Sequence, residues 1–142
     1  MLARPHARRR HAGRWNQWAP VMTRYSTLLL DNTGWDLLAD AAGNIAVAAP
    51  PYALAQDVAS AIKLSLGELW YNAAPGVPYF SEILGQSPPI GVFQEYMVRA
   101  ALTVPGVVSA QCVINSIEGR AVNGAVTFVD EAGTTQTVAI QQ

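Results

Sequence analysis

The sequence predicts an α+β fold with an N-terminal β-hairpin, two main helices and a C-terminal antiparallel three-stranded meander. Three observations lead to this prediction. Apolar residues recur at helical spacing in the middle of the chain, β-branched runs dominate the last third, and short polar connections join those runs. The 142 residues fit one domain, and a hydrophobic content of 51% is sufficient for a core.

The first patterned segment predicts the hairpin. Leu28–Leu30 is a short apolar run, and Trp35–Ala39 and Ile45–Ala49 flank a connection that contains Gly43-Asn44. A Gly-Asn pair tolerates the positive φ that a tight hairpin connection requires. Pro50–Pro51 ends the second strand, because proline has no N–H to donate to a neighbouring strand.

Two long helices and a short helical turn are expected next. The first helix covers Tyr52–Leu69 and follows a proline, the turn covers Tyr79–Leu84, and Pro88–Pro89 opens a second helix that reaches Thr103. Each helix carries one apolar stripe with spacings of three and four residues. The stripes consist of Leu54, Val58, Ala61/Ile62, Ser65/Leu66 and Leu69 in the first helix, and of Ile90, Phe93, Met97 and Ala100/Ala101 in the second.

Three strands follow, at Val107–Ile117, Ala121–Val129 and Thr134–Ile140. Their connections are too short for a parallel crossover, so we expect an antiparallel meander with the helices on one face. Thr134–Ile140 is expected at an edge of this sheet.

Charge divides the chain into a basic arm, residues 1–27, and a single acidic domain, residues 28–142. The first 30 residues carry six arginines and no acid, a charge of +6, and the rest carries three basic and ten acidic residues, a net −7. Met1–Val21 has three interpretations. It is a tail that binds nucleic acid or a membrane through its arginines, Trp15 and Trp18, an organellar transit peptide, or an extension upstream of a domain that begins at Met22. The last is favoured.

The residue types argue against catalysis and against a metal or cofactor. Both histidines, His6 and His11, lie in the arm, so the domain cannot form a Ser-His or Cys-His pair. Cys112 is the single cysteine and is expected as a small buried side chain. We expect no enzymatic activity, no cofactor and no metal. There is no apolar run of membrane-spanning length and no secretory signal pattern, which predicts a cytoplasmic, soluble domain.

One stretch carries a resemblance. A helix that begins near Gln56-Asp57-Val58 runs into Leu66–Asn72, followed by Pro75–Tyr79 and Ile83-Leu84-Gly85, and the hairpin precedes it. Over Leu28–Ile140 this arrangement resembles the small baseplate wedge proteins of contractile-tailed phages, the lysozyme-like baseplate wedge family, with relatives in type VI secretion baseplates. Leu69 departs from the pattern, since many relatives carry an arginine there.

The resemblance implies a structural protein of the virion tail baseplate, assembled in the host cytoplasm in several copies per particle. Its partners would be other wedge proteins and the tail sheath, with no small-molecule substrate and no membrane. It would link the wedge core to the first sheath ring and start sheath assembly by strand addition. The residues implied for the wedge interface are Gly67, Glu68, Trp70, Gly76, Pro78 and Tyr79, and those for sheath strand addition are Thr137, Val138, Ala139 and Ile140.

Two other functions stay open at the level of sequence. A cell-wall glycosidase would use Glu68 or Glu82 as its acid. A nucleic-acid-binding accessory would bind through the basic arm, with a steep dependence on salt.

Overall fold

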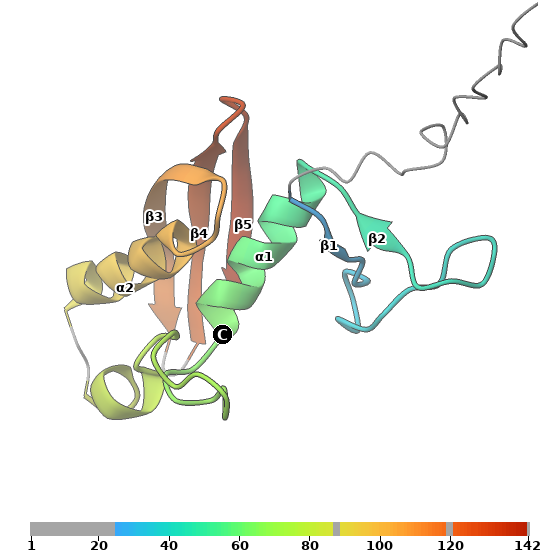
Figure 1. Cartoon of the computed structure of the whole chain (residues 1–142). Coiled ribbons are helices and arrows are strands. Elements are labelled where there is room, and N and C mark those ends of the chain that lie inside the picture. The colour runs from blue at the N-terminus through green and yellow to red at the C-terminus, as the bar shows by residue number, and fades with distance from the viewer. Residues whose placement is uncertain (1–24, 87–88, 119–120, 142) are drawn as a thin grey trace, which may run out of the picture.

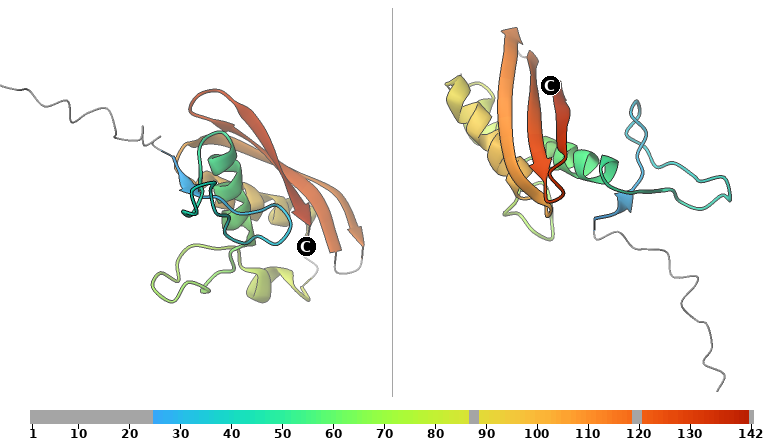
Figure 2. Two further views of the ribbon diagram at one scale, coloured as in Figure 1. Left: turned by 90° about the vertical axis from the view of Figure 1, so that its right-hand side faces the viewer. Right: turned by 90° about the horizontal axis from the view of Figure 1, so that it is seen from above.

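A computed structural model describes residues 25–86, 89–118 and 121–141 and confirms the α+β class. In chain order the elements are β1 (Thr27–Leu28), β2 (Val47–Ala48), α1 (Tyr52–Lys63), the π-helix η1 (Tyr79–Ile83), α2 (Ile90–Leu102), β3 (Val107–Glu118), β4 (Ala121–Asp130) and β5 (Thr135–Gln141). Figures 1 and 2 show α1 and α2 on the same side of the sheet formed by β3, β4 and β5. Of the predicted arm, residues 1–27, the first 24 residues lie outside the described part of the chain.

The three C-terminal strands form an antiparallel sheet in the order β3-β4-β5, so β5 lies at an edge as expected. The strand boundaries agree with the prediction to within one residue. The β3–β4 register shifts between Ile114 and Ser116. Opposite this irregularity a Cβ on Gly124 would lie 2.5 Å from the carbonyl oxygen of Val113, so only glycine fits there.

The core fills the space between the two helices and one face of the sheet. Its members are apolar side chains from α1, α2, β4 and β5 together with Tyr79 of η1. The largest fully buried side chains are Phe128, Met97, Val58, Val77 and Val126. Because β4 is the central strand, Val126 and Phe128 lie under both helices, and the opposite face of the sheet is left without a covering layer of described residues (Figure 2).

Helix α1 ends at Lys63, six residues before the predicted end. Leu64 has extended backbone, and its N–H still bonds to the carbonyl of Ser60. The chain then turns to pair with Val77, whose N–H donates to the carbonyl of Leu64 at 2.8 Å. As a result Leu66 is 48% exposed instead of buried. In α2 the predicted stripe is buried except for Ile90, which lies exposed in the first turn.

The N-terminal hairpin is confirmed, but its second strand pairs with residues 27–28 as well as with the predicted first strand. Ala39 bridges Ile45 around the predicted connection, where Gly43 has a φ of +83°. The two-residue ladder, however, joins β2 to β1 and not to residues 35–39. The packed structure also includes Tyr25, whose ring lies against Gly106 and whose hydroxyl donates to Glu131 at 2.8 Å. The fold therefore starts before residue 28.

A buried glutamine of α1 bonds the hairpin to the rest of the domain, in addition to the contacts of Tyr52 with Asn32 and of Lys63 with the Trp35 ring. Gln56 of α1 is 5% exposed, and its Oε1 accepts from the N–H of Leu30 at 2.9 Å while its Nε2 donates to the carbonyl of Leu28 at 2.6 Å. The amide thus bonds the backbone at β1 as a neighbouring strand would. Among the described residues no helix is long and apolar enough to cross a membrane.

Candidate partner-binding surfaces

Along the β5 edge, main-chain N–H and C=O groups point alternately toward β4 and away from it. The hydrogen bond in the turn before β5 shows which residues point which way. The N–H of Asp130 donates to the carbonyl of Thr134 at 3.0 Å, and the register pairs Phe128 with Gln136 and Val126 with Val138. In an antiparallel pair every second residue bonds to the partner strand and the residues between face outward. The outward N–H and C=O groups on β5 therefore belong to Thr135, Thr137 and Ala139.

Of the four residues that the resemblance implied for strand addition, two have outward main-chain groups and two do not. Thr137 and Ala139 direct their main-chain groups away from β4, along an edge that no other described strand occupies. Val138 and Ile140 direct theirs toward β4, and the Ile140 side chain is buried in the core. Val138 and Ile140 hold β5 in the sheet, and they offer no main-chain group to an incoming strand.

The two edges of the sheet differ. At the β3 edge the side chain of Gln94 on α2 donates to the carbonyl of Cys112 at 3.1 Å, which occupies one outward acceptor. Thr135–Gln141 of β5 contains no charged residue and no proline. Edges exposed to solvent are normally protected by such residues against pairing with another chain. Val107–Ile117 of β3 also lacks charge and proline, but β3 has two register shifts and the Gln94 contact, so β5 is the less protected edge.

A second candidate surface is the loop of residues 64–77, called here the aromatic loop. Its ends are joined by two hydrogen bonds, from Leu66 N–H to the Val77 carbonyl at 2.9 Å and from Val77 N–H to the Leu64 carbonyl at 2.8 Å. Gly76 has a φ of +123°, and a Cβ there would lie 2.6 Å from the backbone of Ser65. Glycine at this position lets the two ends of the loop approach so closely.

The carboxylate of Glu68 stabilises the aromatic loop from inside. Its Oε2 accepts from the N–H of Ser65 at 2.9 Å, and the Glu68 N–H donates back to the Ser65 carbonyl. The loop thereby holds Trp70 and Tyr71 outward, 92% and 68% exposed, with their rings edge to face at 5.6 Å. An exposed tryptophan–tyrosine pair on an anchored loop is typical of the residues that contribute most energy to protein interfaces.

The predicted interface residues are therefore not brought to one surface. Gly67, Glu68 and Trp70 lie exposed on the aromatic loop, whereas Pro78 and Tyr79 are buried. The Tyr79 hydroxyl donates to the carbonyl of Ile62 at 2.5 Å, between α1 and α2. A side chain in this position has no surface to offer a partner, so Tyr79 serves the core.

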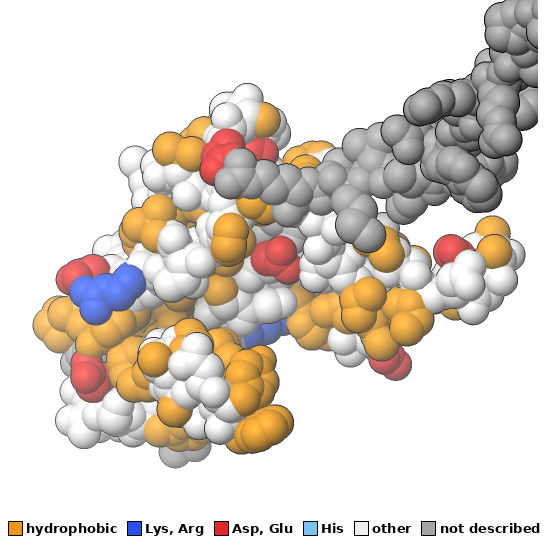
Figure 3. Space-filling view, in the orientation of Figure 1, with side chains coloured by type: hydrophobic (Ala, Val, Ile, Leu, Met, Phe, Trp, Pro, Cys, Tyr) orange, Lys and Arg blue, Asp and Glu red, His pale blue; other side chains and the backbone are white. Residues whose placement is uncertain are grey.

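Sequence reasoning missed other exposed apolar side chains near this loop. Figure 3 shows hydrophobic side chains gathered over residues 64–84 at the lower end of the view, and again over the hairpin. Besides Trp70, the large exposed members of this region are Leu66, Tyr71, Phe80 and Leu84. Exposed apolar patches of this kind mark interaction surfaces. Their aromatic residues were visible in the sequence, but nothing there indicated which would point outward.

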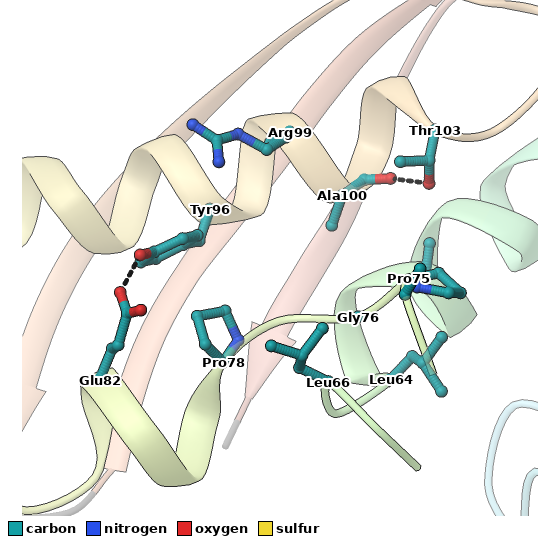
Figure 4. A pocket seen from close by; sticks show the side chains of 12 residues that line it. Leu64, Leu66, Pro75, Gly76, Pro78, Glu82, Tyr96, Arg99, Ala100 and Thr103 are labelled. Atoms are coloured by element: carbon teal, nitrogen blue, oxygen red, sulfur yellow. Dashed lines mark hydrogen bonds between the residues drawn. The ribbon is translucent and has the colours of Figure 1, made fainter. Parts of the chain in front are cut away.

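A groove lies between α2 and the segment of residues 64–78 (Figure 4), with a volume of about 350 Å³. Leu64, Leu66, Pro75, Pro78 and Ala100 supply apolar parts of its lining. At one end the Tyr96 hydroxyl donates to the carboxylate of Glu82, and this hydrogen bond raises the pKa of Tyr96. Arg99 also lines the groove and is paired with Glu95 at 2.7 Å.

The two glutamates considered for glycoside hydrolysis occupy different places. Glu82 lines the groove, whereas Glu68 does not and bonds to the backbone of its own loop. A glycosidase requires both carboxylates on the two sides of one bound sugar linkage. Within the described ranges no three His, Cys, Asp or Glu side chains gather as they would around a metal ion. Burial raises the pKa of the half-buried Cys112 thiol, which opposes its use as a nucleophile.

In comparison with known proteins, the sequence matches no family model and no curated protein.

Proposed function

We propose that this protein is a structural subunit of a contractile-tail baseplate that binds protein partners through the β5 edge and the aromatic loop. The proposal combines the resemblance of residues 28–140 to baseplate wedge proteins with the arrangement of these two surfaces. In it, β5 accepts a strand of the tail sheath, and the aromatic loop contacts a wedge protein. The protein has no catalytic role.

The observation that carries the proposal is the β5 edge. Thr135, Thr137 and Ala139 offer successive outward main-chain donors and acceptors on a strand without charge or proline. Strand addition obtains affinity from such groups and register from the alternating side chains. A protein that spent its time as a monomer would risk aggregation through this edge, which favours a partner that covers it.

The aromatic loop supports the same conclusion from a separate part of the chain. Its anchoring by Val77 and Glu68 fixes the loop before a partner arrives, so that less conformational entropy is lost on binding. The low proportion of charged residues, 13% of the chain, agrees with a surface that is largely covered by other subunits.

The sheath contact is tested by a proline at Thr137. Because the N–H of Thr137 points away from β4, proline there removes an outward donor without breaking a bond inside the sheet. The matched control is Thr137→Ala, which keeps the N–H. We expect baseplates that contain Thr137→Pro to carry no extended sheath in electron micrographs, whereas those with Thr137→Ala carry normal sheaths.

Circular dichroism checks that both variants fold with the same secondary structure. Equal sheath assembly on the Thr137→Pro and wild-type baseplates, with both proteins folded and incorporated, would contradict strand addition at β5. Loss of sheath with both Thr137 variants would also contradict it, because the alanine variant retains every main-chain group.

A further inference from the structure

The groove between α2 and residues 64–78 fits a ligand with an apolar body and a cationic end. Its walls contain Leu64, Leu66 and Pro75, while one end holds the Glu82 carboxylate. Arg99 is the basic residue in the lining, and its charge is offset by Glu95 at 2.7 Å. Glu82, Glu95 and Arg99 together leave one net negative charge at this end, and Tyr96 adds a polar group bonded to Glu82.

The N-terminal arm has the complementary chemistry. Its sequence from Arg14 to Trp18 places an arginine beside one tryptophan and near a second, within a segment that contains six arginines and no acid before Asp31. A guanidinium matches a carboxylate in geometry and bears a permanent charge. The indole rings supply apolar area for the walls. The rest of the chain is acidic, with a net charge of −7.

The arm joins the fold on the side of the groove where Thr103 lies, at the opposite end from Glu82 (Figure 4). Tyr25, the first described residue, packs against Gly106, which is three residues after Thr103 in the lining of the groove. Trp18 lies seven positions before Tyr25 and Arg14 eleven, and an extended chain covers about 3.3 Å per residue, so roughly 23 Å is available to Trp18 and roughly 36 Å to Arg14. A segment tethered so closely has an effective concentration on the order of millimolar, enough for a weak site to be occupied.

We propose that the arm segment Arg14–Trp18 docks in the groove of its own chain, with Arg14 at the Glu82 carboxylate and a tryptophan against the apolar wall formed by Leu66 and Pro75. This inference is independent of the baseplate proposal. Docking would cover an apolar groove and withdraw Arg14 from nucleic acid.

Trypsin tests the proposal on the full chain, because docking protects the bond after Arg14. The rate of that cleavage, followed by mass spectrometry, is compared with the rate in a synthetic peptide of residues 1–21. Protection follows the fraction of time the segment is released, so we expect a rate about tenfold slower in the full chain. In Glu82→Gln and Leu66→Arg the rate should rise to that of the peptide.

Two matched controls carry the same chemical changes outside the groove. Glu118→Gln removes a carboxylate at the end of β3, and Leu84→Arg adds a cation at another exposed leucine. Both should keep the slow rate.

Equal cleavage rates in the full chain and the peptide would overturn the proposal. So would protection that rises with protein concentration, which would place the arm on a second copy. Protection seen only after a duplex oligonucleotide is added would assign the arm to nucleic acid instead.

Discussion

Trp70 and Tyr79 are nine residues apart in the sequence, but Trp70 is exposed and Tyr79 is buried. Substituting an exposed and a buried aromatic residue tests this difference. Trp70 is 92% exposed, so Trp70→Ala should change the free energy of unfolding by less than about 0.5 kcal/mol. Phe93 is buried, and Phe93→Ala should cost roughly 3–5 kcal/mol. Urea denaturation gives both values. If Trp70 is an interface anchor, Trp70→Ala should also weaken wedge assembly by about tenfold or more. A large loss of stability with Trp70→Ala would instead place the indole in the core.

The sequence could not tell that Trp70 is exposed and Tyr79 buried, because the type of an aromatic residue after a helix does not determine whether its side chain packs inward or outward. What decides the matter is the hydrogen bond from Tyr79 to Ile62, which joins residues 17 positions apart. The close approach of Gly76 to Ser65 is likewise a long-range contact.

Among the elements, the hairpin is bonded to α1 through one buried amide, that of Gln56, in addition to the exposed contacts of Tyr52 and Lys63. Gln56→Leu keeps the size of the side chain but leaves the Leu30 N–H and the Leu28 carbonyl without their partner. An unsatisfied buried group costs about 1–3 kcal/mol, so the hairpin should detach locally. Hydrogen exchange at Leu30 and Ala46 should become at least tenfold faster, with the sheet unaffected. Gln94→Leu, which removes the comparable bond to Cys112, serves as the control and should leave hairpin exchange unchanged. Unchanged exchange in Gln56→Leu would show that the other contacts, those of Tyr52 and Lys63 among them, are enough to retain the hairpin.

Helices and strands could be predicted from the sequence where the local pattern of apolar residues determines them. The three C-terminal strands follow their β-branched runs, and α2 follows its stripe from Phe93 to Ala101. Helix α1 was overextended to Leu69, because Leu66 and Leu69 continue its periodicity. The pairing of residues 64–66 with Val77 prevails over that pattern by satisfying backbone groups that a longer helix would have bonded internally.

The molecule as a whole has helices on one face of its sheet, an opposite face without a covering layer of described residues, and two unequal edges. The β3 edge receives the Gln94 side chain and carries register shifts, whereas the pairing of β5 is regular. The aromatic loop presents Trp70 and Tyr71 elsewhere on the surface. A sheet with one more protected and one less protected edge is suited to directional addition of a single strand, and this asymmetry is the main physical argument for a role in assembly.

Hydrogen exchange along β5, measured in the isolated protein and in the assembled particle, tests this claim most directly. In the isolated protein the amides of Thr135, Thr137 and Ala139 should exchange rapidly, while those of Gln136 and Val138, bonded to β4, exchange slowly. In the particle the three outward amides should slow by about a hundredfold or more, because a partner strand pairs with them. Slow exchange of the outward amides in the isolated protein, or equally rapid exchange in the particle, would contradict strand addition at this edge.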